Sequence, residues 1–410
     1  MRLIQLWTKI FALALMLFAA SVIAHAAGAV QLAVTSVTTD LLAVTGVLGG
    51  LLVPATQLRI RTMRQRAARA TARFAPADES PDSILHAALA PLVEARAVRD
   101  LAAALIVRGE PVTFFPPGDS KRQGRRYEVG SLTKPMTGEL LASLILDNSV
   151  TLSATIGELL ADWHLAAPVA NITLQELVTH RAGLGRLPRS LLFAVATRLS
   201  SDPYRWLSAA ALRHACARDR RVQPVPTYSN LGFAVLGQAL GRVHGVDYRQ
   251  ALQTRVLDPL ALADTLVDAP NLPRSQRLSG HDRTGVPTPW WHTGVMAAAG
   301  GVSMTITDGA RWLAAHVERP PEYAPVIARA TEPLAAFGPD RIGMGWIIRS
   351  VDGRTVVWHN GATGGFSSFA AFDPDRGLGV IAFAASQAPG VLDQAGLWIM
   401  RQRIGRPHRD

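Results

Sequence analysis

The pattern of apolar and polar residues changes twice after residue 84. Apolar runs at 101–107 and 112–115, separated by the turn Arg108-Gly109-Glu110-Pro111, predict a strand hairpin. Helical spacing of apolar residues then dominates from about 131 to 330. Strand-like apolar runs return near the C-terminus, at 345–350, 355–359, 366–372 and 380–385.

Strands from both ends with helices between them imply one antiparallel sheet, assembled from the two ends of a single unit. Flanking helices are predicted at 84–96 and at about 391–404. The fold class is therefore α+β, with a mostly helical region inserted, and residues 84–405 form one large domain.

The first 73 residues have a different character. An uncharged run at 10–24 precedes Ala24-His25-Ala26, which resembles a secretory cleavage site. A second uncharged run, 41–58, is followed at once by an arginine cluster at 59–73. We expect one or two membrane segments within residues 1–58.

The cluster and the polar, proline-containing residues 74–83 then form a basic flank and linker, spanning 59–83. An amphipathic surface helix is the alternative for the cluster.

Two membrane topologies fit the N-terminal residues. In a hairpin of two spans, the positive-inside rule places the domain in the cytoplasm; if the first run exports the chain, the domain lies outside.

Composition excludes several classes of function. Hydrophobic residues make up 49% of the chain and charged residues 18%, which excludes disorder for most of it. Of the net charge of +11, residues 1–73 carry +7, from eight basic residues and Asp40, so nucleic-acid binding has little support. A single cysteine, Cys216, excludes an internal disulfide. No histidine pair has metal-ligand spacing, and we expect no metal or other cofactor.

The first candidate catalytic pair is Ser131 and Lys134, at the start of a helix predicted to reach Leu146. Spacing of three residues places both side chains on one helix face. A desolvated lysine can remove the proton of a serine hydroxyl and so make it a nucleophile. The alternative is a helix-capping serine beside a lysine exposed to solvent.

Two further clusters carry candidate chemistry. Tyr228-Ser229-Asn230 leads into an apolar helix. A neighbouring cation that lowered the pKa of Tyr228 below about 10 would let its phenol act as general base and acid. Alternatively, Ser229 or Asn230 caps the helix. His359-Asn360-Gly361 ends a strand before further glycines, which allow a ligand to approach the backbone; a plain hairpin turn is the alternative.

Together, Ser131-x-x-Lys134, Tyr228-x-Asn230 and His359-x-Gly361 resemble the serine beta-lactamase and penicillin-binding protein superfamily, and its class C branch best. Segments 177–184 and 299–303 resemble further, non-catalytic signatures of that branch. The resemblance covers residues 84–405 and implies the beta-lactamase/transpeptidase-like fold.

The resemblance also implies an acyl-enzyme mechanism on an amide or ester, from a small-molecule or peptide acyl donor. Ser131 attacks the carbonyl, while Lys134 and Tyr228 move protons. Asn230 orients the acyl group. The backbone N–H groups of Ser131 and Ala362 stabilise the oxyanion.

His359, with Asn360 and Gly361, would line the same side of the pocket and help to hold a substrate carboxylate or the proton on Tyr228. Histidine stands where class C enzymes usually carry lysine, so carboxylate anchoring is expected to be weaker. A D-alanyl-D-alanine carboxypeptidase or an esterase is therefore an alternative to a beta-lactamase, and an acylated ligand sensor is the non-enzymatic one.

An α/β-hydrolase is disfavoured because no Gly-x-Ser-x-Gly occurs. Family precedent favours an extracytoplasmic domain anchored to the membrane by its N-terminus. No protein partner is identified by the sequence.

Overall fold

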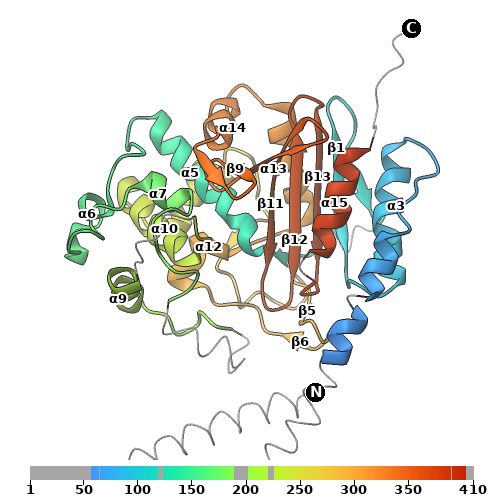
Figure 1. Cartoon of the computed structure of the whole chain (residues 1–410), viewed down its shortest axis with the longest axis horizontal. Coiled ribbons are helices and arrows are strands. Elements are labelled where there is room, and N and C mark those ends of the chain that lie inside the picture. The colour runs from blue at the N-terminus through green and yellow to red at the C-terminus, as the bar shows by residue number, and fades with distance from the viewer. Residues whose placement is uncertain are drawn as a thin grey trace, which may run out of the picture.

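The computed structural model describes residues 57–63, 65–118, 123–188, 202–219, 226–388 and 390–402. Its largest sheet has eight strands in the order β2-β1-β13-β12-β11-β10-β9-β8, and every neighbouring pair is antiparallel (Figure 1). The strands of this sheet are β1 (Ala102–Val107), β2 (Thr113–Phe115), β8 (Ala335–Phe337), β9 (Asp340–Ile342), β10 (Ile347–Val351), β11 (Arg354–Ala362), β12 (Ser367–Asp373) and β13 (Leu378–Ala384).

Two smaller sheets lie beside it. The first has the order β3-β7-β4 and the second pairs β5 with β6. Their strands are β3 (Tyr127–Glu128), β4 (Leu266–Val267), β5 (Gly280–His281), β6 (Pro287–Thr288) and β7 (Val302–Met304).

Helices occupy most of the segment between β3 and β8 and also flank the sheet at both chain ends. The α-helices are α3 (Pro81–Glu94), α5 (Thr133–Leu146), α6 (Ile156–Leu159), α7 (Leu174–Val178), α9 (Ala209–Asp219), α10 (Asn230–His244), α11 (Tyr248–Leu252), α12 (Ala297–Gly300), α13 (Ile306–Glu318), α14 (Ala324–Thr331) and α15 (Val391–Arg401). Short 3-10 helices are η1 (Gly130–Leu132), η2 (Ala161–Trp163) and η4 (Gly294–Met296), and η3 (Gln253–Leu257) is a π-helix.

The sheet is assembled from both ends of the domain, and the α+β prediction is confirmed. β1 pairs with β13 over six residues, from Ala102 opposite Phe383 to Val107 opposite Leu378. Side chains of adjacent strand residues face opposite sides of a sheet. In β1, Ala103 and Leu105 therefore join one core cluster, and Ala104 and Ile106 join the other.

Different helices cover the two faces of the sheet. α3 and α15 pack on one face and on each other, and α13 packs on the other face against β1 and β13 (Figure 1). The inserted helices α5, α7, α10 and α12 extend from this second face and form the larger core cluster. The candidate chemistry lies where these helices meet the sheet.

The arginine cluster near the N-terminus lies in a helical segment. Residues 57–63 and 65–71 are helical, and Ala70 is buried in the same core cluster as α3 and α15. Phe74 packs against Trp398, with ring centroids 5.3 Å apart. Helix α3 begins at Pro81, three residues before the predicted start at 84, and is capped by the Ser80 hydroxyl.

In the part of the chain that the structure describes, no helix is long and apolar enough to cross a membrane. Apart from residues 57 and 58, the two predicted N-terminal membrane segments lie outside the described residues.

Candidate active site

Ser131 lies in a tight turn between strand β3 and helix α5. The turn is the 3-10 helix η1, and its first residue, Gly130, has φ +52°. A Cβ at this position would lie 2.8 Å from the backbone nitrogen of Ala362, so a glycine is required. The predicted helix ends at Leu146 as expected, while its α-helical part begins at Thr133, two residues after the serine.

Lys134 is completely buried beside the serine. Its Nζ lies 3.0 Å from Ser131 Oγ, 2.8 Å from Asn230 Oδ1 and 2.6 Å from the carbonyl oxygen of Ala299. Burial lowers the pKa of Lys134 well below its ordinary value, and the charge of Arg186 lowers it further. A solvent-exposed lysine is therefore excluded.

Lys134 Nζ contacts three oxygens, and its lowered pKa makes the uncharged amine accessible. A neutral Lys134 has two N–H donors and one lone pair. The Asn230 Oδ1 and the Ala299 carbonyl can only accept, so they take the two donors. The lone pair is then left to accept the hydroxyl proton of Ser131, which is the arrangement a general base requires.

Tyr228 and Asn230 lie at the N-terminus of α10. Ser229 caps this helix, because its Oγ accepts a hydrogen bond of 2.8 Å from the Gly232 N–H. Asn230 is thereby left to contact Lys134 through Oδ1, and its Nδ2 donates to the Tyr204 hydroxyl at 3.2 Å.

The prediction of a lowered pKa for Tyr228 is wrong. Lys134 Nζ lies 4.8 Å and the Arg186 guanidinium carbon 5.0 Å from the centre of the ring. Burial nevertheless dominates and raises the pKa of Tyr228 well above its ordinary value, although a hydrogen bond with Ser131 and the charge of Arg186 oppose the rise. Tyr228 is therefore a neutral phenol at pH 7, which can donate a proton but is not a resting base.

The prediction of a partly charged His359 on the pocket wall is also wrong. Its side chain is 1% exposed, and it lies behind the residues that line the cleft. Burial lowers the pKa of His359 well below its ordinary value, and any charge on Lys134 acts in the same direction, so the imidazole is neutral. Anchoring of a carboxylate by charge is thus unavailable at this position.

Asn360 and Gly361 do reach the cleft. The Nδ2 of Asn360 donates to Asp393 Oδ2 at 2.7 Å. A Cβ on Gly361 would lie 2.0 Å from the carbonyl oxygen of Val129 and 2.9 Å from the backbone nitrogen of Ser131. The close approach of β11 to the serine turn therefore depends on this glycine.

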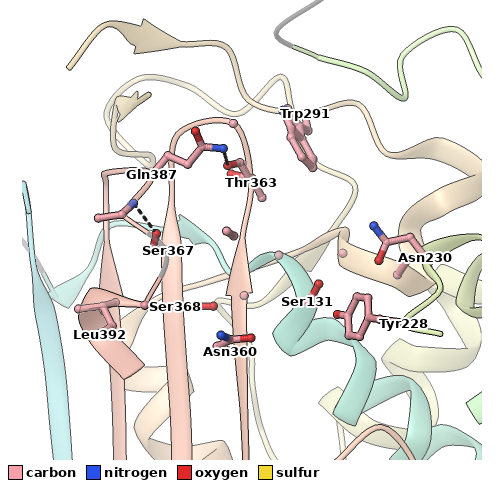
Figure 2. Close-up of a pocket in the computed structure, with 18 of the residues that line it drawn as sticks. Ser131, Tyr228, Asn230, Trp291, Asn360, Thr363, Ser367, Ser368, Gln387 and Leu392 are labelled. Atoms are coloured by element: carbon pink, nitrogen blue, oxygen red, sulfur yellow. Dashed lines mark hydrogen bonds between the residues drawn. The ribbon is translucent and has the colours of Figure 1, made fainter. Parts of the chain in front are cut away.

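Six of the candidate residues line one cleft of about 810 Å³, whereas Lys134 and His359 are buried behind its surface. The six are Ser131, Tyr228, Asn230, Asn360, Gly361 and Ala362. Figure 2 shows Ser131 with Tyr228 and Asn230 on one side and Asn360 on the side of the sheet. Ser131 and Ala362 both line the cleft, and their backbones come together through the two glycines that precede them. The three sequence motifs are thus assembled around one serine, with His359 behind them.

Two residues that sequence reasoning did not select support this arrangement. His180 Nδ1 accepts a hydrogen bond of 3.1 Å from the Ser229 N–H, and its ring lies 4.4 Å from that of Tyr228. Burial lowers the pKa of His180 well below its ordinary value, so it is neutral. Its segment, 177–184, resembles a non-catalytic signature of the class C branch, which does not indicate the contact with Tyr228.

The second such residue is Glu128, which immediately precedes the serine turn. Its carboxylate accepts hydrogen bonds from the Trp291 N–H at 2.6 Å and from the Thr363 hydroxyl at 2.7 Å. Burial raises the pKa of Glu128 to about 7. Glu128 thus links β3 to the loop after Ala362 by a hydrogen bond. Its one sequence signal is its position three residues before Ser131.

Known proteins are similar to this chain in sequence and in fold. A family model described as Beta-lactamase matches residues 85–403. A beta-lactamase of Escherichia coli K12 is 26% identical over 364 residues, covering 78% of this chain and 93% of that protein. The D-alanyl-D-alanine-carboxypeptidase/endopeptidase AmpH of the same organism is 27% identical, covering 61% of this chain and 68% of that protein.

Among solved structures, a class C beta-lactamase from Rhodobacter sphaeroides superposes with a TM-score of 0.66. It covers 77% of this chain and 97% of that one at 21% identity, and it supports the fold alone. The family match spans more than half of the chain. The chain therefore belongs to the beta-lactamase family, within the serine beta-lactamase and penicillin-binding protein superfamily, and is a hydrolase.

Proposed function

We propose that this protein is a membrane-tethered serine hydrolase that forms an acyl-enzyme on Ser131 with an amide or ester substrate. The observation that carries the proposal is the buried Lys134, with Nζ 3.0 Å from Ser131 Oγ and both remaining contacts made to acceptors. Burial lowers the pKa of this amine and so favours its neutral form, whose lone pair is directed at the hydroxyl proton.

Acylation begins when Lys134 takes the hydroxyl proton of Ser131 as Oγ bonds to the substrate carbonyl carbon. The carbonyl oxygen becomes an oxyanion between the backbone N–H groups of Ser131 and Ala362. The intermediate collapses, the bond to the leaving group breaks, and the leaving group takes the phenol proton of Tyr228. Lys134 then returns its proton to Tyr228, so charge balances.

Deacylation repeats these steps with water as the nucleophile. Water gives a proton to the base, its oxygen bonds to the acyl carbon, and Ser131 Oγ leaves and is reprotonated. Asn230 holds Lys134 in place and offers its side-chain amide to the acyl group. His359 stays neutral beside Tyr228 and contributes no charge.

Intact-mass spectrometry of the full-length protein tests this proposal. The protein is mixed separately with a penicillin and with 4-nitrophenyl pentanoate, and the mass is followed with time. With the ester, we expect an adduct on Ser131 that clears as hydrolysed product forms. Ser131→Ala should abolish the adduct, whereas Ser153→Ala, an exposed serine on another loop, should not change it.

Each outcome distinguishes one of the candidate functions. Turnover of penicillin indicates a beta-lactamase, and a persistent penicillin adduct indicates a carboxypeptidase-like enzyme or a sensor. Turnover of the ester alone indicates an esterase. Labelling of Ser131→Ala at the full rate would refute the proposed nucleophile.

The tether belongs to the proposal because the uncharged runs at 10–24 and 41–58 precede the arginine cluster. Full-length protein should sediment with membranes and resist extraction by high salt, and a chain lacking residues 1–56 should not. Protease added to intact cells should cleave the catalytic domain if it is extracytoplasmic, the side that family precedent favours. Recovery of the full-length protein in the soluble fraction would refute the tether.

A further inference from the structure

We infer that the cleft selects its substrate by charge: Arg186 binds a carboxylate carried by the acyl group, and Asp393 disfavours a carboxylate on the leaving group. The inference rests on the proposed function and names its substrate class, half-esters or half-amides of dicarboxylic acids. It follows from how charged side chains are distributed along the cleft.

Among the described residues that line the cleft, four carry a charge: Arg186, Asp282, Arg283 and Asp393. Asp282 and Arg283 are neighbours in sequence and contribute opposite charges. Arg186 contacts Tyr228, and Asp393, in the first turn of α15, accepts a hydrogen bond from Asn360. Tyr228 and Asn360 lie on opposite sides of the cleft (Figure 2), so the two charges belong to different walls. The cleft is therefore positive at one wall and acidic at the other.

Arg186 lies on the wall that holds Tyr228 and Asn230. Its guanidinium carbon is 5.0 Å from the centre of the Tyr228 ring, and its carbonyl oxygen accepts a hydrogen bond of 3.0 Å from the Asn230 N–H. The residue is exposed, and no Asp or Glu of the described residues forms a salt bridge with it. A planar guanidinium held by stacking and open to the cleft suits a substrate carboxylate.

Asp393 lies on the opposite wall, next to Asn360. The Asn360 Nδ2 donates to one carboxylate oxygen of Asp393 at 2.7 Å. The nearby Arg349 is already paired with Asp340 through two hydrogen bonds, at 2.9 and 2.7 Å. Burial raises the pKa of Asp393, whereas the hydrogen bond from Asn360 and the charge of Arg349 favour its ionised form. Arg349 is thus already engaged by Asp340 and Asp393, and a second carboxylate here would face Asp393.

The neutral His359 adds to this asymmetry. Burial keeps its imidazole uncharged and places it behind the wall, so the sheet side of the cleft offers no histidine cation to offset Asp393. Arg186 and Asn230 lie together on the side proposed to hold the acyl group. A carboxylate is therefore accommodated on the acyl part of a substrate and not on its leaving group.

Matched pairs of esters test the inference on the full-length protein. The first pair is mono-4-nitrophenyl glutarate and 4-nitrophenyl pentanoate, which share a leaving group and differ by one carboxylate on the acyl chain. The uncatalysed rate is subtracted for each. We expect a higher kcat/KM for the glutarate, and Arg186→Gln should lower the glutarate-to-pentanoate ratio by about tenfold, as expected for loss of a charge-assisted hydrogen bond.

Two variants control for charge and folding. Arg186→Lys keeps the positive charge and should retain most of the ratio. Arg213→Gln removes an exposed arginine of α9 that does not line the cleft and should leave the ratio unchanged.

The second pair tests the acidic wall. Pentanoate esters of phenol and of 3-hydroxybenzoic acid differ by a carboxylate on the leaving group. Asp393→Asn should raise kcat/KM for the 3-hydroxybenzoate ester relative to the phenyl ester several-fold.

Failure of the inference is distinct from failure of the proposed function. If the nitrophenyl esters acylate Ser131 but Arg186→Gln leaves their ratio unchanged, charge selection by Arg186 is refuted and the hydrolase proposal stands. If Asp393→Asn leaves the ratio of kcat/KM for the 3-hydroxybenzoate ester to that for the phenyl ester unchanged, the role of the acidic wall is refuted. If no ester or penicillin acylates Ser131, both proposals are overturned.

Discussion

Replacing Glu128 by glutamine should remove a pH-dependent loss of stability. The carboxyl group is buried, and it accepts hydrogen bonds from the Trp291 N–H and the Thr363 hydroxyl. Burial disfavours its charged form and raises its pKa from 4.5 to about 7. The folded protein therefore binds this proton more tightly than the unfolded chain does.

The sign and size of the effect follow from proton linkage. A group with a raised pKa in the folded state contributes stability below pH 4.5, and that stability is lost as pH rises through about 7. At about 1.4 kcal/mol for each pH unit between the two pKa values, the free energy of unfolding falls by about 3 kcal/mol over this range. Glutamine resembles the protonated acid and can still accept from Trp291, so Glu128→Gln should not show this loss.

Urea unfolding of the full-length protein, followed by tryptophan fluorescence at pH 5, 6, 7 and 8, measures the difference. We expect the variant and the wild type to be similarly stable at pH 5 and the variant to be more stable at pH 8. If the free energy of unfolding changes with pH in the same way for both proteins, the reasoning is refuted. A variant that loses stability equally at every pH would show that the hydrogen bonds, and not the proton, dominate.

Two further predictions follow from the same site. The charge of Arg186 helps to lower the pKa of Lys134, so Arg186→Gln should raise that pKa. In a plot of kcat/KM against pH for a neutral ester, the acidic limb should then move to higher pH, and an unmoved limb would contradict this coupling. Gly361→Ala places a Cβ 2.0 Å from the Val129 carbonyl, so it should reduce ester turnover by more than about 100-fold through displacement of the oxyanion site. As a control, Gly353→Ala has open space but a φ of +77°, so it should lower stability slightly and leave the turnover of the folded protein intact.

The sequence predicted those features that depend on local pattern. Alternating and helical spacing identified the hairpin that contains β1, the C-terminal strands and the helix ending at Leu146, since each is long enough to show its period. The hairpin of β8 and β9 was missed. Each of its strands has only three residues, too few for a periodic signal, and they lie at the sheet edge.

Electrostatics at the site could not be predicted in the same way. The spacing of Ser131 and Lys134 indicates their contact, but the pKa of Tyr228 and of His359 depends on how completely each is buried. That burial is created by segments far away in sequence, such as His180 packing on Tyr228. Arg186 and Glu128 likewise act through neighbours that only the folded chain supplies.

The order of synthesis matters for a site made from both ends of a domain. Ser131 emerges early from the ribosome, whereas Ala362 and strand β13, which pairs with β1, are made about 230 residues or more later. At roughly 5–20 residues per second, tens of seconds pass before the two halves can meet. A chain interrupted before β11 carries the nucleophile and its base but lacks the strand that completes the oxyanion site, so a nascent or truncated protein should remain catalytically silent.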